Sequence, residues 1–108
     1  MMYSLEYFNQ RVRSDIEAWP VSMLASYARL IELLAEFGPN LGMPNSRAIG
    51  NGLFELRIHG REGIGRVMYC FLIGKRIVIL HSFVKKTRST PRHELEIARK
   101  RKMKVNHG

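Results

Sequence analysis

The sequence predicts an α+β fold in which helices pack on a mostly antiparallel sheet. An apolar stripe with helical spacing lies in the first half of the chain, and three segments with strand-like apolar patterns follow one another in the second half. At 108 residues the chain can bury one hydrophobic core and is too short for two. We therefore expect a single domain over residues 1–108, with its elements in the order strand, two helices, three strands and helix.

The first half is expected to hold the strand and two helices. Residues 2–8 are predicted to form a short strand, and residues 9–18 a short helix. Pro20 suits the first turn of the second helix, because its missing N–H has no helical partner there. Gly38 and Pro39 end this helix, since glycine accepts the left-handed cap conformation and proline cannot continue a helix. The apolar stripe along the helix consists of Met23, Tyr27, Leu30, Leu34 and Phe37.

Three consecutive strands are expected over residues 53–59, 64–73 and 77–83. The first alternates apolar and polar side chains. The other two are almost continuously apolar, as strands buried on both faces are. A four-residue loop at residues 60–63 and a two-residue turn at residues 74–75 are predicted to join them into an antiparallel sheet.

The remaining segments are a loop and a helix. Residues 38–52 are rich in glycine, proline and asparagine, and we expect them to form a surface loop. Thr90 and Pro91 are expected to open the last helix as its cap and first residue. This helix ends in a strongly basic run, and the tail from about residue 103 to residue 108 is expected to be frayed.

Positive charge is concentrated in the second half of the chain. The net charge is +9, yet residues 1–50 carry four basic and five acidic side chains, whereas residues 51–108 carry fourteen basic and four acidic ones. One-sided charge of this kind favours a polyanionic partner, above all a nucleic acid. An acidic protein partner is the alternative.

Cysteine, histidine and hydropathy patterns exclude several classes. Cys70 is the only cysteine and lies in an apolar run, where a small buried residue is expected rather than a reactive thiol. The histidines show no metal-ligand spacing, and no glycine-rich phosphate motif opens a helix, so we expect neither a metal site nor a small-molecule cofactor. Since there is no signal peptide and no apolar run of about 18 residues, a cytoplasmic protein without membrane contact is expected.

The predicted strand register brings basic side chains together. With the two connections placed as above, Arg57 lies opposite Arg66 on one sheet face, and the side chains of His81 and Lys85 project from that face too. Two facing arginines repel each other unless an anion lies between them, and a phosphate would meet that need. The alternatives are that each arginine is a solvated strand residue and that His81 is a core residue.

Further basic side chains extend this surface. Lys86 and Arg88 follow the last strand and could track a phosphate backbone. Arg99, Lys100 and Lys102 in the last helix are predicted to bind RNA in the same way, the alternative being a solvated helix end.

Three segments resemble a known family. The stretches "LFELRI" and "GRVMYC", and above all residues 79–101, "ILHSFVKKTRSTPRHELEIARKR", are similar to the phage-associated, HigB-type branch of the RelE toxin superfamily. The order of elements also matches over roughly residues 3–103. This resemblance implies the toxin of a type II toxin–antitoxin system, which cuts mRNA on the ribosome without a metal ion and is neutralised by a cognate antitoxin.

The resemblance also implies roles for individual residues. Arg57 and Arg66 fit the arginines that stabilise the transition state, and Lys85 and Lys86 fit lysines that hold phosphate or assist proton transfer. His81 is the expected acid or base. The chain departs from several family members in having no tyrosine near its C-terminus, where His107 is the only comparable group. Two alternatives stay open: a non-catalytic RNA-binding module, and a degenerate toxin that binds only an antitoxin.

Overall fold

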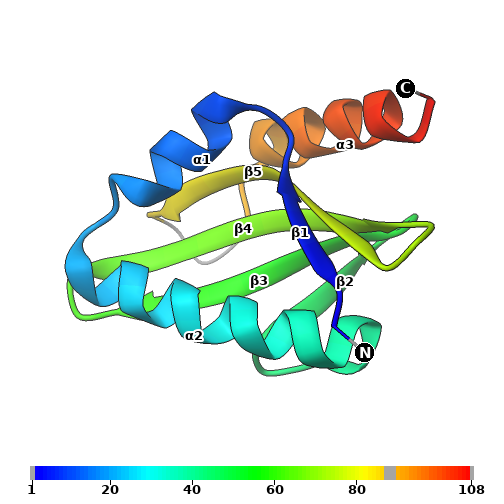
Figure 1. The fold of residues 1–108 in the computed structure, drawn as a ribbon. Helices are drawn as coiled ribbons and strands as arrows, with labels where there is room; N and C mark the ends of the chain where they lie inside the picture. Colours follow the sequence, from blue (N-terminus) through cyan, green and yellow to red (C-terminus); the bar gives the residue numbers. More distant parts are fainter. Residues whose placement is uncertain (1, 87–89, 108) are drawn as a thin grey trace.

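A single five-stranded sheet organises the molecule (Figure 1). The computed structural model describes residues 2–86 and 90–107. The strand order is β1-β5-β4-β3-β2, in which β1 runs parallel to β5 and all other neighbours are antiparallel. The elements are β1 (Ser4–Tyr7), α1 (Gln10–Glu17), α2 (Val21–Phe37), the 3₁₀ helix η1 (Gly38–Asn40), β2 (Ser46–Gly50), β3 (Leu53–Gly60), β4 (Gly63–Leu72), β5 (Arg76–Lys85) and α3 (Arg92–His107).

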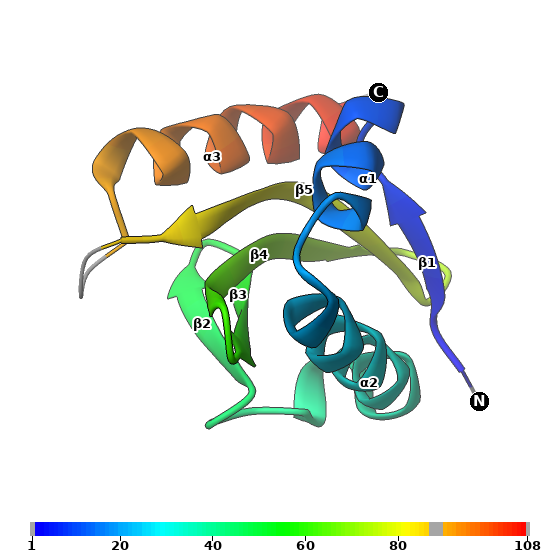
Figure 2. The ribbon, with the colours of Figure 1, turned by 90° about the vertical axis from the view of Figure 1, so that its left-hand side faces the viewer.

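Helices cover both faces of the sheet (Figure 2). On one face, α1 and α2 bury apolar side chains against β3, β4 and β5, although Phe37, the last residue of the predicted stripe, is 48% exposed at the end of α2. On the other face, α3 packs through Ala98 on a second cluster that includes Met68 and Leu80. The α+β prediction and the prediction of two-sided central strands are therefore confirmed. Among the described residues, no helix is long and apolar enough to cross a membrane.

One strand lies where a loop was predicted. Residues 46–50 form β2, an edge strand that pairs with β3, and the prediction of an uninterrupted loop over residues 38–52 is wrong. Asn51 and Gly52 have φ values of 54° and 79° and join the two strands as a two-residue turn. An Asn-Gly pair is the strongest short-range signal of such a hairpin. The sequence did not predict β2 because few of its residues are apolar.

The hairpin of β4 and β5 differs from its predicted register in two ways, and the two register shifts cancel. The turn holds three residues rather than two, because Leu72 pairs with Arg76. This contradicts the predicted pairing of Ile73 with Arg76. A β-bulge then shifts the register between Met68 and Tyr69, so that Met68 still lies opposite His81 and Arg66 opposite Phe83, as predicted.

Register at the other hairpin follows the prediction. Arg57 pairs with Arg66 and His59 with Ile64. The connection itself is shorter than the predicted four-residue loop, since Gly60 and Gly63 pair with each other. The pairing on which the basic site depends is therefore confirmed.

The last helix differs from its prediction at both ends. It begins at Arg92, and the hydroxyl of Thr90 donates to Glu55 in the sheet. The expected fraying from residue 103 is not observed, because α3 continues to His107. Val105 packs against the second core cluster, which gives this last turn an apolar anchor.

Gly65 offers a test of the packing that supports the neighbouring Arg66. A Cβ at position 65 would lie 2.8 Å from the indole Cη2 of Trp19, while a Cβ at position 63 would lie 3.3 Å from the flexible Met23 Sδ and 3.9 Å from Val84 Cγ1. We expect Gly65→Ala to lower the free energy of unfolding by about 1–3 kcal/mol. Gly63→Ala is the control and should stay within about 1 kcal/mol of the wild type in urea denaturation. Equal losses in the two variants would contradict this packing.

Candidate functional site

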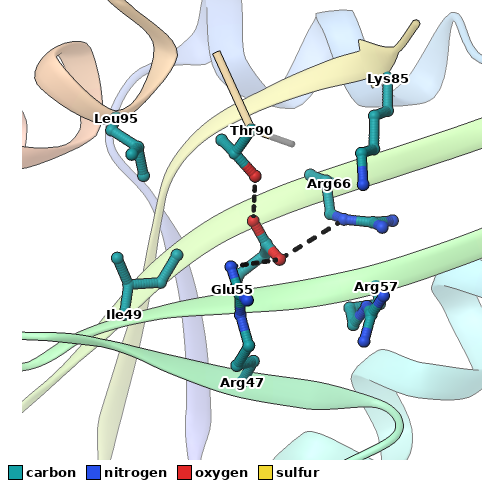
Figure 3. Close-up of a pocket in the computed structure, with 8 residues that line it drawn as sticks. All are labelled: Arg47, Ile49, Glu55, Arg57, Arg66, Lys85, Thr90 and Leu95. Carbon is teal, nitrogen blue, oxygen red and sulfur yellow. Dashed lines mark hydrogen bonds and ion pairs between the residues drawn. The ribbon is translucent and has the colours of Figure 1, made fainter. Parts of the chain in front are cut away.

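A cleft of about 420 Å³ opens on the α3 side of the sheet, between β2, β3, β4, the end of β5 and the start of α3 (Figure 3). Four of its lining residues are basic and one is acidic, which leaves a charge excess of three. The lining residues are Arg47, Ile49, Glu55, Arg57, Arg66, Lys85, Thr90 and Leu95.

Arg57 and Arg66 lie side by side on adjacent strands. The Arg66 side chain is 2% exposed, and its Nη1 donates to the carbonyl of Gly65 at 3.0 Å. Within the described part of the chain, the buried Nε atoms of both arginines lack a hydrogen-bond partner. Buried donors normally have partners, so two guanidinium nitrogens without hydrogen bonds on neighbouring strands mark this pair as a candidate anion site.

Glu55 is the counter-ion of this site. Its Oε1 lies 3.4 Å from Arg66 Nε and 3.8 Å from Arg47 Nη2, while its Oε2 accepts a hydrogen bond from Thr90 Oγ1 at 2.7 Å. The contact with Arg66 is an ion pair without hydrogen-bond alignment, since that Nε remains unpartnered. Glu55 was not among the predicted site residues. Glu55 lies two residues before Arg57 in β3, so both side chains project from the same face of the sheet. This spacing was the one sequence feature that could have indicated a role for Glu55 in the site.

The cleft carries a positive potential that acts on its own side chains. The pKa of Arg66 is lowered, first by burial, with Arg57 adding to the effect against the opposing influence of Glu55. Burial and then Arg66 lower the pKa of the Lys85 ammonium. The pKa of His59, beside the cleft, falls below 6.5 because of burial and then because of Arg66, Arg57 and Lys85. A bound anion would relieve this mutual repulsion.

His81 lies apart from the arginines. It shares their sheet face, but its Nε2 contacts Glu94 Oε1 of α3 at 2.6 Å and its ring stacks on Phe83. It is not among the residues that line the cleft. The structure therefore brings together three of the four predicted catalytic residues, Arg57, Arg66 and Lys85, and places His81 under the first turn of α3.

The five predicted RNA-binding residues divide into separate groups. Lys86 is exposed beyond the end of β5, and Arg88 lies outside the described residues. Arg99 and Lys102 line a smaller hollow at the turn between β2 and β3, whereas Lys100 is exposed and lines neither this hollow nor the cleft. The side chain of His107 lies outside the described part of the structure.

Neither a thiol nor a metal cluster is available in this region. Cys70 is buried, and burial raises its pKa. Across residues 2–86 and 90–107, no three His, Cys, Asp or Glu side chains come together as metal ligands. The polar side-chain groups that line the cleft are guanidinium groups, one ammonium group, one carboxylate and one hydroxyl.

Comparison with known proteins places the chain in a family. Residues 14–103 match the model of the family described as "Phage derived protein Gp49-like (DUF891)". The chain is a member of the Gp49-like family. A comparison with curated protein sequences finds no significant match for this Gp49-like chain.

A solved structure shares the fold of the Gp49-like chain. A chain of the archaeal RelE–RelB complex from Pyrococcus horikoshii OT3 superposes with a TM-score of 0.54 and 21% sequence identity. The match covers 82% of this chain and all of the archaeal one (100%). At this level of identity the similarity establishes a RelE-like fold.

His59 can report whether the cleft holds an anion. Its imidazole should titrate below pH 6.5, since the neighbouring cations disfavour a second positive charge. Inorganic phosphate bound between the arginines should raise the pKa of His59, because it neutralises those cations. NMR titration of the imidazole with and without phosphate measures this shift. The Arg66→Gln protein should show a higher pKa without phosphate, and an unchanged His59 pKa in both experiments would contradict an anion site.

Proposed function

We propose that this Gp49-like protein is the toxin of a type II toxin–antitoxin system and cleaves mRNA, without a metal ion, while the message is bound to the ribosome. The observation that carries the proposal is the pair of buried, unpartnered arginine Nε atoms in a cleft with a positive charge excess. That arrangement suits a phosphodiester whose negative charge increases during reaction.

Cleavage would proceed by attack of a ribose 2′-hydroxyl on the adjacent phosphorus. The new O2′–P bond forms as the P–O5′ bond breaks and the 2′-hydroxyl proton passes to solvent, which yields a 2′,3′-cyclic phosphate and a 5′-hydroxyl. Arg57 and Arg66 would hold the non-bridging oxygens, where charge accumulates in the phosphorane-like transition state. Glu55 serves this step as a positioning residue, since its carboxylate already contacts two arginines and Thr90.

Lys85 is the proposed proton donor to the leaving 5′ oxygen. Among the described residues that line the cleft, it is the only titratable group that is neither a guanidinium nor the Glu55 carboxylate. Its lowered pKa makes the ammonium a stronger acid than an ordinary lysine. His81 retains its predicted role only if its contact with Glu94 at 2.6 Å is broken when RNA binds.

The partners follow from the fold and the charge. The similar archaeal chain was solved in a RelE–RelB complex, which supports an antitoxin as a protein partner here. Ribosome-bound mRNA suits a sparse acid–base set, because the ribosome can order the RNA for attack. The similarity of residues 79–101 to the HigB-type branch supports assignment to that branch, and a ribosome-bound substrate would place the protein in the cytoplasm.

Expression in a bacterium tests the activity. Wild-type protein should arrest growth and create in-frame breaks in translated messages, whereas Arg66→Gln should slow cleavage by about 100-fold or more and abolish arrest. Arg57→Gln, at a less buried position, should act in the same direction if the Arg66 variant fails to fold. Arg29→Gln removes an exposed charge from α2, on the other face of the sheet, and should remain toxic.

The outcomes of this experiment separate the three functions. Normal growth and intact messages with folded wild-type protein would contradict the nuclease. RNA binding without cleavage would then favour the non-catalytic module. Antitoxin binding without RNA binding would favour the degenerate toxin.

Proton donation by Lys85 can be tested with a modified leaving group. Lys85→Arg keeps the charge but replaces the ammonium with a much weaker acid, so cleavage should slow by about 100-fold or more. RNA with sulfur at the bridging 5′ position has a leaving group that needs no proton, and the variant should cut it at nearly the wild-type rate. Lys86→Arg is the matched control and should cut both substrates normally. An equal defect on both substrates would contradict proton donation by Lys85.

A further inference from the structure

A second basic hollow lies beside the cleft. It has a volume of about 180 Å³ and is lined by Gly50, Asn51, Leu53, Arg99, Lys102 and Met103. We propose that the backbone of single-stranded RNA leaves the cleft along the seam between α3 and the β2–β3 hairpin, and that Arg99 and Lys102 bind a second phosphate there. This inference rests on the proposed function, because it takes the cleft as the site of the reacting phosphate.

The two hollows are neighbours along both walls of the seam. Ile49 lines the cleft, and the next residue of β2, Gly50, lines the second hollow. On the helix, Leu95 lines the cleft and Arg99 lies four residues later, close to one helical turn. A chain that enters the cleft therefore reaches Arg99 and Lys102 by following one continuous seam.

The structure selects these two cations from the basic run of α3. Arg99 and Lys102 follow Leu95 by four and seven residues, so the three side chains share one helix face. Arg101 instead lies over the ring of Phe8 and donates to the Leu80 carbonyl, while Lys104 lines a different hollow beside β1 and β5. Lys100 lines none of these hollows.

Arg99 and Lys102 are available to bind an anion. No carboxylate lines their hollow, and neither side chain forms an ion pair within the described residues. The hairpin turn leaves room for the lysine, since a Cβ at Gly52 would lie 3.1 Å from Lys102 Cε and 3.4 Å from its Nζ. By contrast, the exposed Arg11, Arg13 and Arg76 are each paired with a carboxylate.

Charge-matched double variants test the second phosphate site. Arg99→Gln with Lys102→Gln removes two charges from the seam, and Arg29→Gln with Lys104→Gln removes one exposed charge from α2 and one from α3 outside the seam. The probe is a 2′-O-methyl oligoribonucleotide, which cannot be cut because it lacks the attacking hydroxyl. The seam variant should bind it about tenfold or more weakly, and the slope of log affinity against log salt should fall by about 0.7 for each phosphate that the variant no longer binds. The control should keep nearly the wild-type slope.

Probe length distinguishes the seam from the cleft. A 2′-O-methyl dinucleoside monophosphate has one phosphate and should bind both double variants like the wild type. Equal losses for the seam and control variants with the longer probe would overturn the second site. If the seam variant loses affinity for poly-glutamate but keeps it for the oligoribonucleotide, the seam is a protein-binding surface and the proposal is overturned. Cleavage by the wild-type protein in the growth experiment would leave the proposed function standing in either case.

Discussion

The ion pair between Glu55 and Arg66 is the interaction on which the site depends. Both side chains are almost fully buried, at 3% and 2% exposure. A buried guanidinium loses its hydration and requires an opposite charge, and removing one partner of such a pair costs about 3–5 kcal/mol. The Glu55 carboxylate holds Arg66 in place through a 3.4 Å contact with its Nε that lacks hydrogen-bond alignment, so the guanidinium keeps a donor that is not hydrogen-bonded within the described residues. Rigidity and an unfilled donor are what binding to a transition state requires.

This buried ion pair beside an open cleft is possible because the two faces of the sheet serve different functions. One face is covered by α1 and α2 over a mainly apolar cluster, in which the hydroxyls of Tyr27 and Tyr69 form hydrogen bonds. The other face is apolar only where α3 covers it, around Met68, Leu80 and Ala98. The same strands extend past the N-terminal end of α3, where the helix no longer covers them. Their side chains in this region include the basic residues of the cleft. The site is thus a polar extension of a core, built on strands rather than on loops.

The register of the two hairpins depends on both local sequence patterns and long-range contacts. The antiparallel pairing of Arg57 with Arg66 was predictable because apolar alternation and turn residues constrain it. The predicted pairing of His81 with Met68 is confirmed although the turn is one residue longer than predicted, because the β-bulge restores the register that the longer turn shifts. Nothing in the run of apolar residues from 77 to 80 reveals a bulge. Its Leu80 carbonyl is satisfied by Arg101, a residue 21 positions away.

The sequence alone determined the α+β class, the two-sided central strands, the facing arginines and Lys85 on their face, because periodicity and hairpin register act over short distances. Only the tertiary structure decided that Glu55 is the buried counter-ion, that Thr90 binds it instead of capping a helix, and that His81 turns to Glu94. It also separated Arg99 and Lys102 from the rest of the basic run. These features depend on where α3 and β2 pack against the sheet. Contacts between distant segments are set by the packing of the whole core, and no local pattern encodes them.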